Sequence, residues 1–548
     1  MIDDATLREA LGLSFTGARA LSARGFSSVD AAASHLDPRL GDLTLPEGMV
    51  GREAAVERLA RAVRAEERIV VFGDYDADGI TAAAVLSAGL RALGGHVEVE
   101  LADRFLGGYG FSEAALARVL EHSPSLVVTC DCGSTDHPRL ESLRLRRIDA
   151  IVVDHHQVPA EPLPVHAFLT PHQPGCRFPF KYLASCGLAL SVVGGVRAAL
   201  ERRLDLRDWL DVVAIGTIGD VAPLTSDNRV LVRHGLERLM GSKRPGLRAL
   251  VGARKTPFAA RDVSFQIAPK LNAPGRLGSP MLALRMLLED DRPRAYALVT
   301  ELESVQARRK ELERELRASI DAAIDRDGLG GRPALVVGAE GWHHGLVGIA
   351  AGRLARRFGC PTIVVAFADG IGTGSVRGPE GFPLHDALAR CRDVLLGFGG
   401  HQAAAGVRVS AARFGEFRTA FEGVCGELAP SVVRPNGPAR VAFDGRDSLR
   451  SLAADWCRFE PCGAGNPAPL VVFEGVSVRR VRLLGGGAYA KLELRIGQED
   501  IPAWLGETPA SLPREGARIT VAAVPRLDDY RGGGAVELAV EAPLEFMG

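Results

Sequence analysis

The sequence predicts an α/β protein with two bodies of sheet and helix, joined by a long helix and followed by a small β-barrel. From Arg68 onward, apolar strands such as RIVVFG and LVVTC are each followed by a helical segment or turn, a pattern typical of a parallel sheet covered by helices. A charged segment without glycine follows, and a second strand–loop–helix–strand unit begins near residue 333. In the last 110 or so residues, apolar and polar residues alternate over short segments separated by glycine-rich turns, as in small barrels.

Composition excludes several classes of protein. The 548 residues are 47% hydrophobic, enough for several folded domains, and 66 Lys and Arg nearly balance 67 Asp and Glu, so any basic surface must be local. No apolar run approaches the roughly 18 residues that a membrane helix needs, and the start MIDDATLREALGL is acidic. We therefore expect a cytoplasmic protein with no membrane partner. The nine cysteines lack the spacing of a structural zinc site.

Changes in pattern divide the chain into five parts. We expect a helical lead-in over 1–50, a parallel-sheet domain over 51–284, a connecting long helix over 285–328, a smaller α/β domain over 329–430 and a barrel of the OB type over 431–548. The helix has dense mixed charge with i to i+4 pairs, which suits an exposed connector. A helix packed on one domain is equally consistent with this pattern.

Acids and histidines follow apolar runs at several predicted strand ends. The segment VFGDYDADGIT carries Asp74, Asp76 and Asp78, and Asp131, Asp154 with His155 and His156, and Asp220 each follow another such run. A single aspartate there is commonly a helix cap. Because the carboxyl ends of parallel strands meet at one edge, four such ends in one sheet favour a ligand site. Gly79 is expected to let the chain turn tightly into the following helix.

The residue types indicate the ligand. Carboxylates with imidazole and no thiolate suit Mn²⁺ or Mg²⁺, and histidine favours manganese. The number of acids allows two divalent cations, which would clamp the attacking and leaving oxygens of a phosphate displacement.

Five ordered motifs resemble a known family. DYDADG, the Asp131 motif, the DHH of residues 154–156 and GDVAPL are similar in order to the DHH phosphoesterases, and DYDADG together with NAPGR (272–276) has the form seen in RecJ-like single-strand exonucleases. GWHHGLVGIAAGRL (341–354) and GFGGHQAAAG (397–406) resemble the DHHA1 associated domain. The resemblance covers roughly residues 40–548 and implies a DHH domain, a DHHA1 domain and an OB-like nucleic-acid-binding domain.

The resemblance implies a 5′-to-3′ exonuclease that removes mononucleotides from single-stranded DNA in repair and recombination, using two Mn²⁺ or Mg²⁺ ions. It gives the ligand role to Asp74, Asp76, Asp131, His155 and Asp220. Asp78 is either a further ligand or a residue that holds a water or a neighbour. His156 would orient His155, contact the scissile phosphate or act as an acid, and Asp154 would accept the proton of an imidazole ring.

The same resemblance implies residues that hold DNA. Arg104, Arg276, Ser375 and Arg377 would form a pocket for a 5′-phosphate, with Tyr109 and Asn272 beside it. Trp342 and His343 either contact substrate or belong to the core. Gly399, Gly400 and His401 form a loop that either contacts substrate or makes a tight turn. The barrel offers alternating basic residues and Tyr530 for a single strand.

The implied partners are a 5′-ended single strand, a helicase and a single-strand-binding protein, with the chain itself a monomer. Two other functions fit the motifs less well. One is a DHH phosphoesterase for short oligonucleotides or cyclic dinucleotides, which typically lacks the barrel and long helix. The other is a non-catalytic replication scaffold, against which the intact acids argue.

Overall fold

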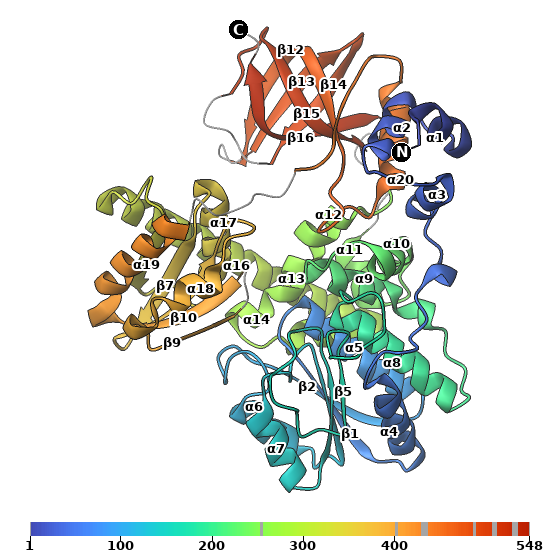
Figure 1. The fold of residues 1–548 in the computed structure, drawn as a ribbon, viewed down its shortest axis with the longest axis vertical. Coiled ribbons are helices and arrows are strands. Elements are labelled where there is room, and N and C mark those ends of the chain that lie inside the picture. Colours follow the sequence, from blue (N-terminus) through green and yellow to red (C-terminus); the bar gives the residue numbers. More distant parts are fainter. Residues whose placement is uncertain are drawn as a thin grey trace. The chain divides into compact units, whose positions relative to one another are not determined.

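A computed structural model describes residues 2–252, 256–400, 404–428, 437–485, 489–506, 512–528 and 535–546. The chain forms two compact units (Figure 1). Unit 1 comprises Met1–Asn272, Pro280–Thr300 and Pro438–Gly548, and unit 2 comprises Ala273–Ser279 and Glu301–Gly437. Among the described helices, none has the length and apolar character needed to cross a membrane.

Unit 1 contains the predicted parallel sheet. Its strand order is β2-β1-β3-β4-β5, and every neighbouring pair is parallel. The strands are β1 (Arg68–Gly73), β2 (His96–Leu101), β3 (Leu126–Cys130), β4 (Asp149–Val153) and β5 (Ala167–Leu169). One face packs on α6 (Glu113–Glu121) and α7 (His137–Leu145). On the other side lie α4 (Arg52–Arg64), α5 (Ala77–Ala92) and α8 (Ser185–Ala199). Both faces are covered, which explains why β1 and β3 are almost continuously apolar.

Helices complete the middle of unit 1. They are η2 (Leu206–Trp209), α9 (Leu210–Gly219), α10 (Ser226–Met240), α11 (Pro245–Val251), α12 (Ala260–Asp262), the π-helix η3 (Val263–Ile267), α13 (Ala268–Asn272) and α15 (Met281–Leu288). α9 packs between α5, α8 and α10, and this position brings its end to the sheet.

Unit 2 has a mixed sheet of order β6-β7-β8-β10-β9, in which only β6 and β7 are parallel. The strands are β6 (Leu335–Glu340), β7 (Thr362–Ala368), β8 (Ile371–Arg377), β9 (Gly397–Gly400) and β10 (Ala404–Ser410). The helices are α14 (Pro274–Leu277), α17 (Val347–Phe358), α18 (Leu384–Ala389), α19 (Phe414–Leu428) and the short η4 (Arg392–Val394) and η5 (Ala411–Arg413).

The long helix α16 (Arg292–Asp327) begins later than residue 285. Glu289 is extended at the end of α15, so a break separates the two helices. Of the two alternatives left open for this helix, packing on one domain fits its C-terminal half, because Leu316, Ile320 and Ile324 lie in the core of unit 2. Most of its charged residues are exposed, but Arg309 and Glu313 are buried and form an ion pair at 3.0 Å.

The C-terminal part of unit 1 is the predicted barrel. Strands β12 (Leu470–Leu484), β13 (Tyr489–Ile496), β14 (Glu499–Leu505), β16 (Val536–Phe546) and β15 (Arg518–Leu527) pair in that order, and β15 closes on β12. The short β11 (Arg440–Ala442) joins β12, and α20 (Leu449–Phe459) packs on the barrel. The fold class predicted from the sequence is thus confirmed.

The N-terminal helices share their core with this barrel. They are α1 (Asp4–Leu11), α2 (Phe15–Ser22), α3 (Val29–Leu36) and η1 (Leu40–Asp42). Leu7 and Leu21 lie in one apolar cluster with Trp456 of α20 and with barrel residues. Ser14 caps α2 and donates from its backbone nitrogen to Asp455 at 2.9 Å, and Asp447 accepts from the first-turn nitrogens of Phe15 and Thr16 at 2.9 and 2.8 Å, so residues from the far end of the chain hold the start of this helix.

Candidate metal centre and substrate residues

Three adjacent strands deliver acids to one edge of the parallel sheet. Asp74 follows β1, Asp131 follows β3 and Asp154 follows β4. The backbone ladder continues through them, since Asp74 N donates to Cys130 O at 3.3 Å and Asp131 N to Val153 O at 3.1 Å. Asp131 has a φ of 62°, a strained conformation for a residue with a side chain. Neighbouring strands therefore fix where these carboxylates point.

Asp220 comes from a helix, so the prediction of a fourth strand end is wrong. The apolar run 210–219 forms α9, which is buried through Ile218, and Asp220 is its C-cap residue. A continuous apolar run looks the same in a buried helix and in a buried strand. An acid at the negative end of a helix dipole is unfavourable by itself. The centre therefore combines three strand ends with one helix end.

Asp76 and Asp78 belong to the start of α5. Asp76 caps the helix, accepting from the backbone N–H groups of Asp78 and Gly79 at 3.0 and 3.2 Å. Asp78 is fully buried, and its two oxygens accept from the backbone nitrogens of Ser185 and Cys186 at 2.7 and 3.0 Å. Asp78 thus ties α5 to the start of α8. This engagement of both oxygens favours a positioning role over direct coordination.

Gly79 serves close packing and not the tight turn that we expected. It lies inside α5 with an ordinary helical conformation. A Cβ at this position would lie 2.5 Å from the carbonyl oxygen of Asp74. Only glycine lets the helix pass this close to the backbone that carries the first acid.

His155 lies among the acids. Its Nε2 is 3.3 Å from Asp131 Oδ1, and its Nδ1 is 3.8 Å from Asp220 Oδ2. Within the described residues, both His155 Nε2 and Asp74 Oδ1 are buried without a hydrogen-bond partner. Three groups each bring their ligand atoms within 4.8 Å of one another: Asp131, His155 and His156; Asp78, His155 and Asp220; and Asp74, Asp76 and Asp131.

The electrostatics of this cluster suit a cation. Burial, followed by repulsion from Asp76, raises the pKa of Asp74, and burial with repulsion from Asp78 and Asp76 does the same to the pKa of Asp131. Burial and the charge of Asp78 raise the pKa of Asp220 to about 9. Burial lowers the pKa of His155, which keeps a ring nitrogen available. Carboxylates that repel one another, together with a neutral imidazole, are the set of donors that a divalent cation binds.

Asp154 orients His156. Its Oδ1 lies 2.7 Å from His156 Nδ1 and also accepts from the backbone nitrogens of residues 155 and 156. Burial opposes the ionised form of Asp154, but the bond with His156 outweighs it and holds the pKa of Asp154 below its usual range. Burial likewise lowers the pKa of His156, and the same bond overrides it and raises that pKa. The other ring nitrogen, His156 Nε2, is 3.5 Å from the Tyr109 hydroxyl.

The loop after β2 brings two predicted substrate residues to the acids. The Arg104 guanidinium stacks 4.3 Å from the centre of the Tyr75 ring, and its charge lowers the pKa of Asp74 against the stronger effect of burial. Tyr109 contacts the rings of Tyr75 and His156. Asn272, at the end of α13, has a buried Oδ1 without a hydrogen-bond partner in the described chain.

Unit 2 gathers the other predicted phosphate residues. Ser375 and Arg377 lie two residues apart on β8, and Arg377 donates to Ser375 Oγ at 3.0 Å and to the carbonyl of Val376 at 2.8 Å. A Cβ on Gly348 would lie 3.1 Å from Ser375 Oγ, so the first turn of α17 passes directly over this pair. A helix start, a hydroxyl and a guanidinium together suit an anion. Arg276 donates to the carbonyl of Gly345 at 3.3 Å, beside the same helix.

The remaining candidates in unit 2 differ in character. The Trp342 ring packs against the core, and its indole nitrogen donates to Ser319 at 3.0 Å, which fits the core alternative. His343 Nδ1 accepts from Gly345 N at 3.2 Å. Gly399 and Gly400 end β9, and Gly400 has a φ of 138° that a side chain rarely adopts. His401 lies outside the described residues.

Two serines that the sequence did not single out hold the acids. Ser134 donates to Asp154 Oδ2 from its hydroxyl at 2.6 Å, and Ser185 Oγ donates to Asp131 Oδ1 at 3.1 Å. Ser134 follows Asp131 within the motif DCGST, and this nearness in sequence to a predicted acid was a signal that could have indicated a role for it in the centre. Ser185 is distant in sequence from every acid, and no local pattern indicates its role.

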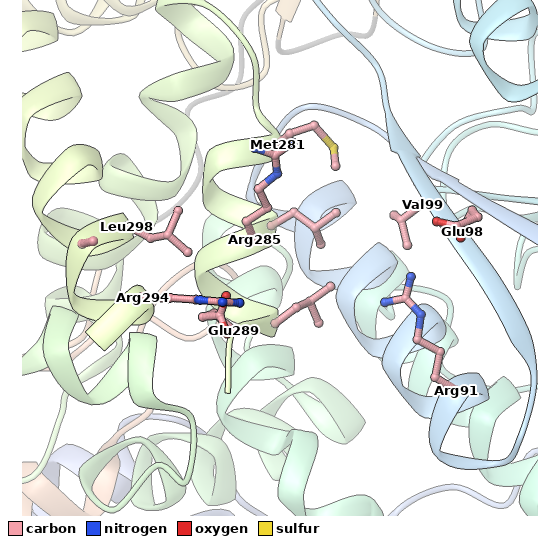
Figure 2. A pocket seen from close by; sticks show the side chains of 11 residues that line it. Arg91, Glu98, Val99, Met281, Arg285, Glu289, Arg294 and Leu298 are labelled. Carbon is pink, nitrogen blue, oxygen red and sulfur yellow. The ribbon is translucent and has the colours of Figure 1, made fainter. Parts of the chain in front are cut away.

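A separate cavity of about 560 Å³ lies in unit 1 at the opposite end of α5 (Figure 2). Its lining includes Arg91, from the last turn of α5, together with Val99 and Arg285, and it shares no residue with the acidic centre. The acidic centre is therefore identified by its side chains and not by a large cavity.

Family models match three stretches of the chain. The N-terminal domain of the DHH family matches residues 68–217, the DHHA1 domain matches 331–427 and the RecJ OB domain matches 444–542. With its parallel sheet and acidic edge, the chain is thus a member of the DHH class of proteins.

Relatives narrow this class. The single-stranded-DNA-specific exonuclease RecJ of Salmonella typhimurium is 34% identical over 480 residues, covering 82% of this chain and 81% of that protein. RecJ of Bacillus subtilis is 33% identical over 497 residues, covering 89% of this chain but 62% of the relative's own length. A crystal structure of RecJ in complex with Mn²⁺ from Thermus thermophilus matches with a TM-score of 0.82 at 32% identity, covering 99% of this chain and 77% of that one. The chain belongs to the RecJ family.

Proposed function

We propose that this protein is an exonuclease that hydrolyses single-stranded DNA from its 5′ end and releases mononucleotides in DNA repair and recombination. The observation that carries this proposal is the cluster around Asp131 and His155, where groups of carboxylate and imidazole atoms lie within 4.8 Å of one another and His155 Nε2 and Asp74 Oδ1 are buried without a hydrogen-bond partner in the described chain. The names of the RecJ relatives supply the substrate class.

The proposed cofactors are two divalent cations, Mn²⁺ with Mg²⁺ as the alternative, held by Asp74, Asp76, Asp131, His155 and Asp220. Bound cations of this kind stabilise the charge that develops on attacking and leaving oxygens. The side chains around them would position the DNA. Arg104 lies beside Asp74 and supplies a guanidinium for the scissile phosphate, and His156, oriented by Asp154, presents its Nε2 next to Tyr109.

Dependence on a 5′ end would come from unit 2. Ser375 and Arg377 meet the first turn of α17, which is a combination that binds phosphate oxygens. We propose that this group, with Arg276, holds the 5′-phosphate. The chain would act as a monomer, with a helicase and a single-strand-binding protein supplying and covering the strand.

The test is digestion of matched strands in Mn²⁺ by the purified full chain. A 5′-phosphorylated strand and its 3′-blocked form should release mononucleotides, and the 5′-blocked form should not. Release from the 5′-blocked strand alone would contradict the polarity. Cleavage confined to dinucleotides would support the small-substrate phosphoesterase, and binding of single strands without any cleavage would support the scaffold.

A further inference from the structure

One exposed aromatic residue has no role in the site described above. Phe265 has 72% of its surface exposed, whereas Phe72 and Phe111 of the same unit are fully buried. Burying a phenylalanine stabilises a fold by roughly 1.5–3 kcal/mol, and this position forgoes that gain. Single exposed apolar residues are common, so the position needs independent support.

The backbone around Phe265 is unusual. Phe265 is the central residue of the π-helix η3, and the first and last residues of that helix, Val263 and Ile267, are buried. The element is thus anchored on both sides while Phe265 faces solvent. π-Helical turns are rare and occur frequently at functional sites.

A cation accompanies the ring. The guanidinium of Arg261 lies 5.4 Å from the centre of the Phe265 ring, and Arg261 makes no ion pair among the described residues. Arg526 of the barrel is close enough that, after burial, the charge of Arg261 is the next largest influence lowering its pKa. An exposed aromatic ring beside arginine is the combination with which proteins hold single strands without reading their sequence.

The π-helix borders the acidic centre. η3 packs against α9, and Ala268, directly after η3, lies 3.5 Å from the Cβ that a side chain at Gly219 would carry. Gly219 immediately precedes Asp220. Phe265 therefore lies on an element that packs against the helix carrying this acid.

We propose that Phe265 and Arg261 form a stacking site for one unstacked base of the single strand, with Arg261 also contacting the backbone phosphate. This site deepens the proposed exonuclease function and rests on it. It positions the strand at a fixed distance from the acidic centre. Because every base has a π-face, the site favours single strands without a preference for sequence.

The first test measures binding of a 5′-phosphorylated strand by fluorescence anisotropy, with Asp131→Asn in every protein to prevent digestion. Phe265→Ala should weaken binding by about 5- to 150-fold, the range that corresponds to stacking of one base. Phe265→Trp should retain binding, and Phe265→Leu should lose it although it stays apolar. Tyr296→Ala is the matched control, since Tyr296 is 60% exposed in the same unit and has no assigned role. Equal binding by all four would overturn the proposal.

The second test locates the base. A series of DNA strands carries one abasic nucleotide each, placed stepwise further from the 5′ end. Protein with Phe265 should bind the strand with the abasic nucleotide at one particular position more weakly than the others. The Phe265→Ala protein should bind all strands of the series equally. A general destabilisation would not produce this coupling. If wild-type protein digests single strands but Phe265→Ala digests and binds them equally well, the stacking site is wrong and the exonuclease function stands. If wild-type protein digests no strand, the proposed function fails and this site fails with it.

Discussion

The two sheets of this protein carry polar side chains of opposite character. At the edge of the parallel sheet, buried Asp74 and Asp131 lie with half-buried Asp220 in a cluster of acids whose charges repel one another. On β8 of unit 2, Arg377 already rests on the Ser375 hydroxyl and the Val376 carbonyl. The ionised acids need a bound cation to offset their repulsion. The Ser375 and Arg377 side chains, in contrast, are already positioned for an anion by hydrogen bonds within the protein. Metal dependence should therefore belong to one sheet and end recognition to the other.

The largest expected effect is at the acidic edge. Asp131→Asn removes a charge that no neighbour in the cluster replaces, and we expect digestion of single strands to fall by more than the roughly 10–100-fold typical of residues around a metal. Chelation with EDTA should abolish activity in wild-type protein. Mononucleotide release measures both effects.

The sign of the stability change provides a sharper check on Asp131→Asn. In EDTA the variant should unfold at a temperature equal to or above that of wild type, because it relieves repulsion among buried acids. Added Mn²⁺ should raise the melting temperature of wild type more than that of the variant. Asp290→Asn, at an exposed acid, is the matched control and should change neither measurement. A variant that melts lower in EDTA would indicate a structural role for Asp131.

A smaller effect is expected from the residue that orients His156. Asp154→Asn weakens the 2.7 Å contact with His156 Nδ1, and activity should fall by about 10–100-fold. If Asp154 acts through His156, then His156→Ala and the double variant should be equally impaired. Additive losses in this double-mutant cycle would contradict that coupling.

Variants on β8 should affect only the recognition of the 5′ end of the DNA. We expect Arg377→Ala to reduce kcat/KM for a 5′-phosphorylated strand by about tenfold or more, the cost of losing one charged hydrogen bond. The same variant should change kcat/KM for a 5′-hydroxyl strand much less. Arg377→Lys should restore little, because lysine cannot form paired bonds to phosphate oxygens. Equal losses on both strands would assign Arg377 to general DNA binding.

The smallest expected effect is on the pH dependence of stability, and it comes from His35, which lies outside both sheets. Burial and the charges of Arg229 and Arg24 lower the pKa of His35 to about 3, and Arg24 lies 3.0 Å from its Nε2. Because the unfolded chain binds this proton near pH 6.5 and the folded chain does not, stability is lost as pH falls below 6.5, by at most about 1.4 kcal/mol per pH unit. Urea unfolding at pH 7 and 5.5 should show a smaller loss for His35→Gln than for wild type. Parallel pH profiles would contradict a His35 that stays neutral in the folded chain.

Local patterns were sufficient for the parts of the centre that follow strands. Asp74, Asp131 and Asp154 each end an apolar run, and parallel strands place such ends side by side, so the cluster could be predicted from the order of elements. The OB-like barrel was predictable for a similar reason, since its strands alternate and its turns are rich in glycine.

Contacts between distant segments were not predictable. The helix that carries Asp220 has the same apolar pattern as a buried strand. Ser185 reaches Asp131 from the start of α8, and Asp447 accepts from the first turn of a helix at the other end of the chain. The need for glycine at position 79 comes from the backbone of Asp74 and from no turn signal. Each of these depends on packing that periodicity does not describe.

The shared core of the N-terminal helices and the barrel has a consequence during synthesis. Leu7 and Leu21 are buried against segments such as α20 and β12, which the ribosome makes more than 400 residues later. At typical rates of 5–20 residues per second, these apolar faces wait roughly 20–90 seconds for their partners. The first helices of the nascent chain are thus candidates for chaperone binding, and the parallel sheet can fold before the segments on either side of it have joined.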